Sequence, residues 1–176
     1  MTQFVAYAPL LVMMTVAAVI DWRSRRLPNW LNLLILIVGI GLAVQGGTHL
    51  SLGASLAGAL VGFILLFPAF ALGALGGGDV KLLTAVGAWT GPVGVLVVLL
   101  ITTVGGAVLA LVQAAQAGKF RALLRNSGLL AVNLVHVRSL GADHVEQTGK
   151  SFRSIDRPLP YAVPMLAAVL VWLAVR

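Results

Sequence analysis

A carboxylate lies between two long apolar runs at residues 75–81, whose sequence is LGGGDVK. The acid of this stretch is Asp79, and three glycines precede it. Only one other acidic residue of the sequence borders an apolar run in this way, namely Asp21 at the end of the first hydrophobic segment. Ionisable groups at membrane depth cost about 2.5–3.5 kcal/mol on insertion scales and are usually functional. Two isolated carboxylates in such a setting therefore become candidates for chemistry.

The composition indicates a membrane protein. Of the 176 residues, 60% are hydrophobic and only 10% are charged. Several apolar runs approach the ~20 residues that a transmembrane helix needs. We therefore predict an all-α fold, a polytopic membrane helix bundle of about six transmembrane helices, with residues 1–176 forming a single membrane-embedded domain.

Proline, glycine and charged residues divide the chain into the expected spans. Pro68 lies inside the third span, and Thr90-Gly91-Pro92 separates the fourth from the fifth. Residues 119–140 mix arginines with leucine and valine, which favours an interfacial amphipathic segment within a longer polar loop at 118–157. The six spans are expected at about residues 4–20, 30–44, 51–72, 80–89, 93–115 and 158–176.

The formal net charge of +7 is explained by loop placement better than by nucleic-acid binding, because the basic residues fall mostly between apolar runs. Lysine and arginine occur after the first, third and fifth spans and are missing after the second and fourth. The positive-inside rule then predicts an N-terminus outside and puts Asp21 and Asp79 at the cytoplasmic ends of their spans. The N-terminus has no basic n-region, so we expect a retained span there and not a signal peptide.

Two carboxylates at the same depth can share one proton. The ionised member then activates a water, while the protonated member polarises a scissile carbonyl. This hypothesis requires no metal and no cofactor, and a chain without cysteine offers no thiol nucleophile. Gly76 and Gly78 are expected to let the chain turn sharply beside Asp79. Pro28 disfavours helix before it, and Asn29 is expected to cap the second helix.

Two further predictions concern residues near the span ends. Lys81 is expected to extend towards lipid phosphates. The tryptophans are expected to act as interface anchors, because all of them lie near span ends. They are Trp22, Trp30, Trp89 and Trp172.

These motifs resemble those of a known family. Residues 76–79, GGGD, fit the GxGD signature of membrane aspartic proteases, and the sequence GDVKL resembles type IV prepilin peptidases and archaeal preflagellin peptidases. Asp21 and the RLPN of residues 26–29 are similar to the D…R.IPN stretch of that family. PYAVP at 160–164 is similar to its late PFGP-like element, with Ala162 in place of the usual glycine. The resemblance thus extends from the first predicted span to the last.

The resemblance implies an aspartic endopeptidase of the inner (cytoplasmic) membrane, with Asp21 and Asp79 as its catalytic residues and its active site facing the cytoplasm. Its implied substrate is a prepilin or pseudopilin, whose short basic leader is cleaved while its apolar helix stays in the bilayer. Membrane lipids are the other expected partner. Long members of the family carry paired CxxC motifs and an N-methyltransferase activity. This chain has no cysteine and no room for such an insert after the first segment, so it resembles the short, peptidase-only kind associated with Flp-type pili.

Other functions remain open at this point. A presenilin-like GxGD intramembrane protease is disfavoured because Asp21 follows Ile20 and the sequence contains no Pro-Ala-Leu. A non-catalytic membrane subunit of a pilus-assembly or secretion system would pair the aspartates with basic groups of its partners. A small proton-coupled transporter would carry charged groups near the bilayer midplane, which this sequence does not show.

Overall fold

The computed structural model describes residues 2–71, 75–116, 118 and 160–176, and these contain helices and no strand. The helices are α1 (Thr2–Ser24), α2 (Asn29–Val44), α3 (Leu52–Ala71), α4 (Gly77–Gln116) and α8 (Ala162–Val175). The all-helical fold class is therefore confirmed for this part of the chain. The predicted interfacial segment and polar loop at 118–157 lie outside the described residues, apart from residue 118.

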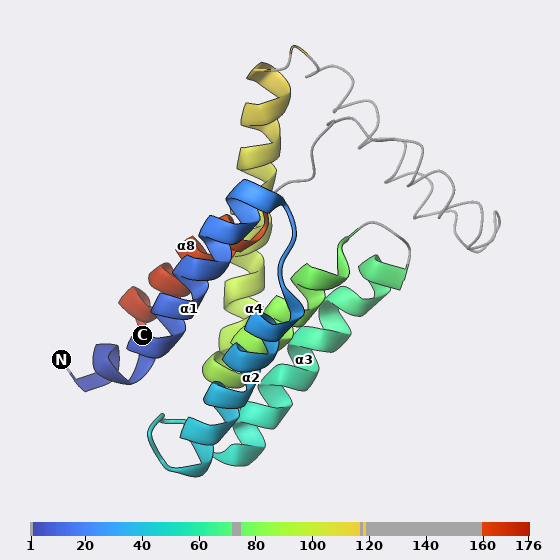
Figure 1. Cartoon of the computed structure of the whole chain (residues 1–176). Coiled ribbons are helices and arrows are strands. Elements are labelled where there is room, and N and C mark those ends of the chain that lie inside the picture. Colours follow the sequence, from blue (N-terminus) through green and yellow to red (C-terminus); the bar gives the residue numbers. More distant parts are fainter. Residues whose placement is uncertain (1, 72–74, 117, 119–159) are drawn as a thin grey trace.

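A bend divides α4 at the break that the sequence predicted. Gly91 has φ 73° and ψ 178°, a non-helical conformation open to glycine and strained for other residues. Figure 1 shows the consequence, because the part of α4 before the bend and the part after it run in different directions. The fourth and fifth predicted spans are thus the two limbs of one kinked element.

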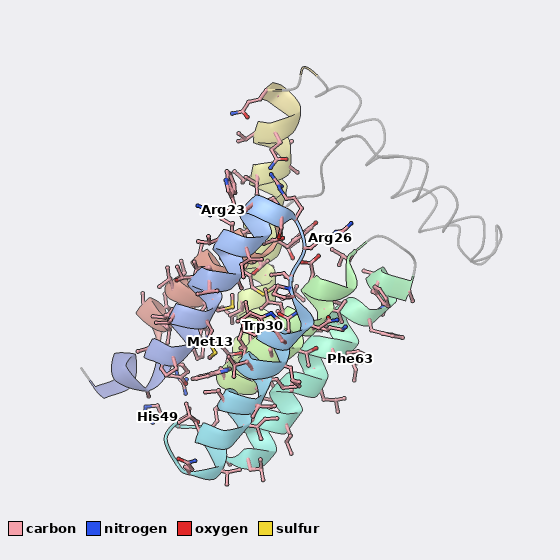
Figure 2. All side chains as sticks on the ribbon, viewed as in Figure 1. Met13, Arg23, Arg26, Trp30, His49 and Phe63 are labelled. Atoms are coloured by element: carbon pink, nitrogen blue, oxygen red, sulfur yellow. The ribbon has the colours of Figure 1, made fainter. Side chains whose placement is uncertain are left out.

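The helices pack along one another, and the end of α4 extends past the end of α1 (Figure 1). Helix α4 contacts α2, α3 and α8, while α1 contacts α2 and α8. Arg23 and Arg26 lie at one end of the bundle and His49 at the other (Figure 2). Arg23, in the last turn of α1, and Arg26, just after it, are therefore at the end where α3 leads into α4. The charge pattern used for the topology predicts this arrangement.

Among the described residues, three helices are long and apolar enough to cross a membrane, within residues 6–24, 52–71 and 77–113. Helices α2 and α8 are apolar but shorter. The number of six spans and the placement of the N-terminus outside remain predictions.

Small residues bring α3 and the first limb of α4 into close contact. A Cβ atom added at Gly58 would lie 2.1 Å from the carbonyl oxygen of Gly87, and one added at Gly87 would lie 2.2 Å from that of Gly58. One helical turn further along α3, a Cβ at Gly62 would lie 2.7 Å from the carbonyl oxygen of Leu83. The buried Ser55 hydroxyl donates to the Ala88 carbonyl oxygen at 2.7 Å. Backbone-to-backbone packing therefore fixes the limb that carries Asp79.

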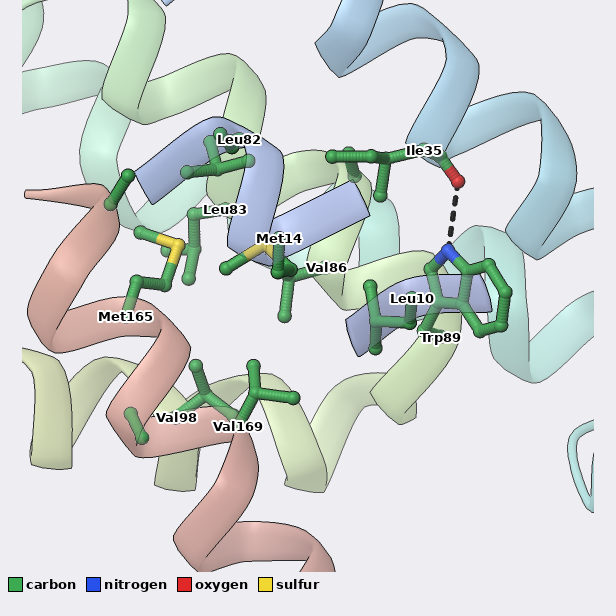
Figure 3. Close-up of a cluster of buried hydrophobic side chains, with 14 of the residues drawn as sticks. Leu10, Met14, Ile35, Leu82, Leu83, Val86, Trp89, Val98, Met165 and Val169 are labelled. Carbon is green, nitrogen blue, oxygen red and sulfur yellow. Dashed lines mark hydrogen bonds between the residues drawn. The ribbon is translucent and has the colours of Figure 1, made fainter. Parts of the chain in front are cut away.

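The core corrects the prediction for two of the tryptophans. Trp89 is fully buried, and its Nε1 donates to the Ile35 carbonyl oxygen at 2.8 Å (Figure 3). Trp172 is also buried, with its ring edge-on to Tyr7 at 5.6 Å between centroids. Both lie near the ends of their apolar runs, but the helices around them supply an apolar environment and a carbonyl acceptor. Trp22 and Trp30 are exposed, so their role as interface anchors remains a prediction.

Candidate active site

Asp21 lies inside α1, in its last turn, and not beyond the end of the helix as the sequence had suggested. The helix continues to Ser24 and is closed by Arg25, which has φ 54° and donates its N–H to the Asp21 carbonyl oxygen at 2.9 Å. Because α1 extends past its apolar run, the Asp21 side chain turns inwards and is only 5% exposed. The positive charge of Arg25 acts on this carboxylate.

The start of α8 holds Asp21 in place. The backbone N–H of Ala162, the first residue of α8, donates to Asp21 Oδ2 at 3.0 Å. This N–H is one of the first-turn donors that a helix cannot satisfy internally, and a carboxylate is favoured at that end of the helix dipole. The late element PYAVP at residues 160–164 thus acts on Asp21 through its backbone.

Asp79 lies in the first turn of α4 and is partly buried. Its backbone N–H donates to the Gly76 carbonyl oxygen at 3.1 Å, and the backbone of Gly76 also contacts its carboxylate. A Cβ atom at Gly76 would lie 3.4 Å from Asp79 Oδ2. The carboxylate therefore folds back over the turn that precedes the helix.

The structure brings the two predicted carboxylates together. Their charges act on each other, although they come from α1 and α4. The charge of Asp79 also acts on Tyr161, the residue before α8. Burial, and after it the charge of Asp79, raises the pKa of the Tyr161 phenol, so this phenol stays protonated at neutral pH. Three segments thus converge on one polar site at the arginine-bearing end of the bundle.

The glycines of the turn act through their size and not through their conformational freedom. None of Gly76, Gly77 and Gly78 has a positive φ, so the turn does not use the left-handed conformation that only glycine adopts easily. The expectation that Gly76 and Gly78 support a sharp turn remains a prediction. A Cβ atom at Gly78 would lie 3.2 Å from Leu27 Cβ. One at Gly77 would lie 3.2 Å from the ring of Phe70. Their lack of a side chain lets neighbouring segments approach the start of α4.

The structure also revises the predicted roles of Pro28, Asn29 and Lys81. The N-cap of α2 is Pro28, and no side chain caps this helix, so the prediction of an Asn29 cap is wrong. Asn29 is instead the first residue of α2, and its Oδ1 accepts a hydrogen bond from Lys81 Nζ at 2.9 Å. The expectation that Lys81 extends towards lipid phosphates is replaced by this contact between α2 and α4.

Sequence reasoning missed two contributors to the site. One is Asn32, which is buried in α2 and whose Nδ2 donates to the Gly78 carbonyl oxygen at 3.3 Å. The other is the backbone N–H of Ala162. An amide inside an otherwise apolar run was the available signal for Asn32, whereas the sequence carries no signal for a backbone donor.

No group of three or more His, Asp or Glu side chains comes together as a metal site within the described ranges. We therefore assign no metal ligand, and the expectation that the reaction needs neither metal nor cofactor remains a prediction.

Comparison with known proteins gives the family. Residues 8–111, which include both aspartates, match the model of the type IV leader peptidase family. The chain is 39% identical over 110 residues to a prepilin leader peptidase/N-methyltransferase of Pectobacterium carotovorum subsp. carotovorum. It is 34% identical over 110 residues to a protein of the same name from Xanthomonas campestris pv. campestris.

These alignments cover 58% of this chain and 39% and 38% of the two relatives, so the matched chain spans less than half of their length. No solved structure matches the chain. The family match covers more than half of the chain and contains both carboxylates, and this chain therefore belongs to the type IV leader peptidase family.

Proposed function

We propose that this chain is a membrane aspartic endopeptidase that removes the short basic leader of a type IV prepilin at the cytoplasmic face of the inner membrane. Asp21 and Asp79 are its catalytic residues. The observation that carries the proposal is that these two carboxylates, from helices α1 and α4, act on each other at one end of the bundle. Membership of a peptidase family supports the reaction class.

The pair supplies an acid and a base. Two interacting carboxylates hold one proton between them, because ionising both at close range is unfavourable. The ionised carboxylate takes a proton from water as it adds to the scissile carbonyl carbon, and the protonated carboxyl donates to the carbonyl oxygen. When the tetrahedral gem-diol collapses, the C–N bond breaks and the pair donates a proton to the leaving amine. One hydroxyl proton of the gem-diol passes to the pair, which then holds a single proton again.

The location of the pair supports a substrate whose cleavage point is at the membrane surface. Asp21 lies in the last turn of α1 and Asp79 in the first turn of α4, and the charge of Asp21 acts on Asp79. Arg23 and Arg26 lie at this end of the bundle (Figure 2). The positive-inside rule makes this the cytoplasmic end. A prepilin with an apolar helix in the bilayer and a short leader in the cytoplasm would present its scissile bond at this level.

The proposed activity is cleavage without methylation. The two relatives carry both activities in their names, but the alignments cover well under half of each. The chain has no cysteine and no insert between α1 and α2, whereas the resemblance associates N-methyltransferase activity with an insert bearing CxxC pairs. Analysis of the cleaved pilin by mass spectrometry would reveal a methylated N-terminus if this part of the proposal were wrong.

The experiment is co-expression with a type IV prepilin, of the Flp type first, followed by gel-shift and mass analysis of leader removal. Asp21→Asn and Asp79→Asn keep side-chain size and abolish the shared proton, so each should reduce cleavage by at least ~10³-fold, in line with losses of principal catalytic groups. Glu146→Gln is the charge-matched control and should cleave normally.

Two outcomes would contradict the proposal. Leader removal that survives either asparagine substitution would exclude the aspartate pair as the catalyst. Loss of pilus assembly in the two variants with leader removal unchanged would favour a non-catalytic assembly subunit.

A further inference from the structure

We infer that Asn32 is a positioning residue, which holds the first turn of α4 so that Asp79 faces Asp21. This inference rests on the proposed function. Asn32 lies in α2 and is 3% exposed. Its Nδ2 donates to the carbonyl oxygen of Gly78, the residue immediately before Asp79, at 3.3 Å. A single side chain thus links α2 to the backbone that carries the proposed catalytic group.

The contacts of α2 bracket Asp79 on both sides in sequence. Asn32 holds Gly78, and Asn29 Oδ1 accepts a hydrogen bond from Lys81 Nζ at 2.9 Å. These two contacts restrict rotation of the first turn of α4 about its axis. The Asn29 contact is solvent-exposed, whereas the Asn32 contact is partly buried and the Asn32 side chain is buried, so Asn32 is the more rigid of the two.

Asp79 needs such a support more than Asp21 does. Asp21 accepts a hydrogen bond from a different helix, through the Ala162 N–H, whereas the Asp79 carboxylate is contacted by the backbone of Gly76 in its own turn. The direction of the Asp79 side chain is therefore set by the placement of its backbone.

The buried Oδ1 of Asn32 argues that this residue does not serve stability alone. It has no hydrogen-bond partner among the described residues. An unpaired buried acceptor opposes folding, and an apolar side chain of the same size would not carry this cost. Asn32 thus contributes less to stability than an apolar side chain would, but it can bind the Gly78 carbonyl oxygen, which an apolar side chain cannot.

The test compares Asn32→Leu with the wild-type enzyme, purified in detergent and assayed on a prepilin with its leader. Leucine is similar in size and removes both the donor and the unpaired acceptor. We expect kcat to fall by roughly 10–100-fold, because displacement of a reacting group by about 1 Å costs up to ~10²-fold. KM should change less than about twofold. The unfolding temperature should equal or exceed that of the wild type.

Thr102→Val is the matched control, since Thr102 is also buried with an unpaired side-chain oxygen, on the second limb of α4. It should leave kcat unchanged. Asn32→Met provides a second variant without a donor and should show the same loss of kcat as Asn32→Leu.

A kcat for Asn32→Leu within about twofold of wild type would overturn the inference. So would parallel losses of kcat and unfolding temperature, or failure of both Asn32 variants to fold, because each of these assigns Asn32 a structural role. The proposed function is judged separately by Asp79→Asn. An inactive Asp79→Asn beside a fully active Asn32→Leu rejects the positioning role alone.

Discussion

The carboxylate of Asp21 accepts its hydrogen bond from a different helix through a backbone amide, that of Ala162. A backbone donor keeps its geometry through any substitution at residue 162 other than proline, provided that α8 begins at the same place. This explains why alanine is compatible with the position at which the PFGP-like element of the family usually has glycine. The contact also makes the start of α8 part of the site, although it is 141 residues away in sequence.

Removing only this N–H should impair the reaction. Replacing Ala162 by lactic acid changes its amide to an ester and deletes the donor to Asp21. A hydrogen bond to a charged group is worth about 1.5–3 kcal/mol, so we expect kcat for leader cleavage to fall by about 10–100-fold. The matched control is the α-hydroxy analogue of Val163, whose N–H donates to the Pro160 carbonyl oxygen at 3.2 Å and does not contact Asp21. Equal activities of the two esters would contradict this role.

Tyr161 allows a prediction about alkaline pH. Burial and then the charge of Asp79 raise the pKa of its phenol above the ordinary value, so the folded state favours the neutral form. The stabilisation is complete below the unfolded-state pKa of about 10 and is lost as pH rises through the folded-state pKa. Between about pH 9 and pH 11, the unfolding temperature of Tyr161→Phe should therefore fall less than that of the wild type. Thermal unfolding in detergent measures this, and parallel curves would show the prediction to be wrong.

The sequence was sufficient to nominate Asp21 and Asp79 as candidates, because carboxylates beside apolar runs are rare enough to stand out. It was not sufficient to find Asn32. Its partner, Gly78, is 46 residues away, and only the packing of α2 on α4 shows that the two meet. The prediction for Asn29 was wrong for a related reason. A local capping role was inferred, whereas the Asn29 side chain accepts a hydrogen bond from Lys81 of another helix.

At the level of helices, the contact between α3 and α4 is the closest packing that the structure describes around the candidate site. Gly58 and Gly87 each face the backbone of the other helix, and the buried Ser55–Ala88 hydrogen bond continues the contact. Because Asp79 lies in the first turn of α4, the position of its carboxylate depends on how closely these two helices approach.

Gly58→Ala should separate the helices. The added Cβ would lie 2.1 Å from a backbone oxygen that cannot rotate away, and overpacking of this kind costs about 1–3 kcal/mol. We expect a lower unfolding temperature and slower leader cleavage. Gly41→Ala in α2 is the control, because its Cβ would meet nothing within 4 Å. That variant should be neutral or slightly stabilised. An unfolding temperature of Gly58→Ala equal to the wild type would argue against tight packing in the membrane.

The sequence predicted where each described helix lies to within a few residues. It did not predict the exact residue at which a helix ends or which of its faces is buried. Proline and glycine at 90–92 correctly marked the bend in α4. The end of α1 was missed because a helix can extend into polar residues, and the apolar run ends before Asp21. Trp89 was misplaced because nearness to a span end does not reveal whether a side chain faces lipid or another helix. The Ile35 carbonyl that accepts from it comes from α2.

For the molecule as a whole, the arrangement of charge predicts one orientation in the membrane. The loop between α1 and α2 should face the cytoplasm and the turn between α2 and α3 the outside. Since the chain has no cysteine, single cysteines at exposed positions report orientation without background. A membrane-impermeant maleimide on cells with a permeabilised outer membrane should label Gln45→Cys and spare Ser24→Cys. The reverse pattern would place Asp21 and Asp79 outside and contradict the proposed face of cleavage.

The bend at Gly91 leaves the first limb of α4 with residues 77–90, which span roughly 20 Å at 1.5 Å per residue. The hydrocarbon layer of a bilayer is about 30 Å thick. Such a hydrophobic mismatch is relieved when the bilayer thins beside a short segment. Headgroups and water then come closer to Asp79 from the side of the bundle. The water needed for hydrolysis would therefore reach the site through the thinned leaflet, without a tunnel inside the protein.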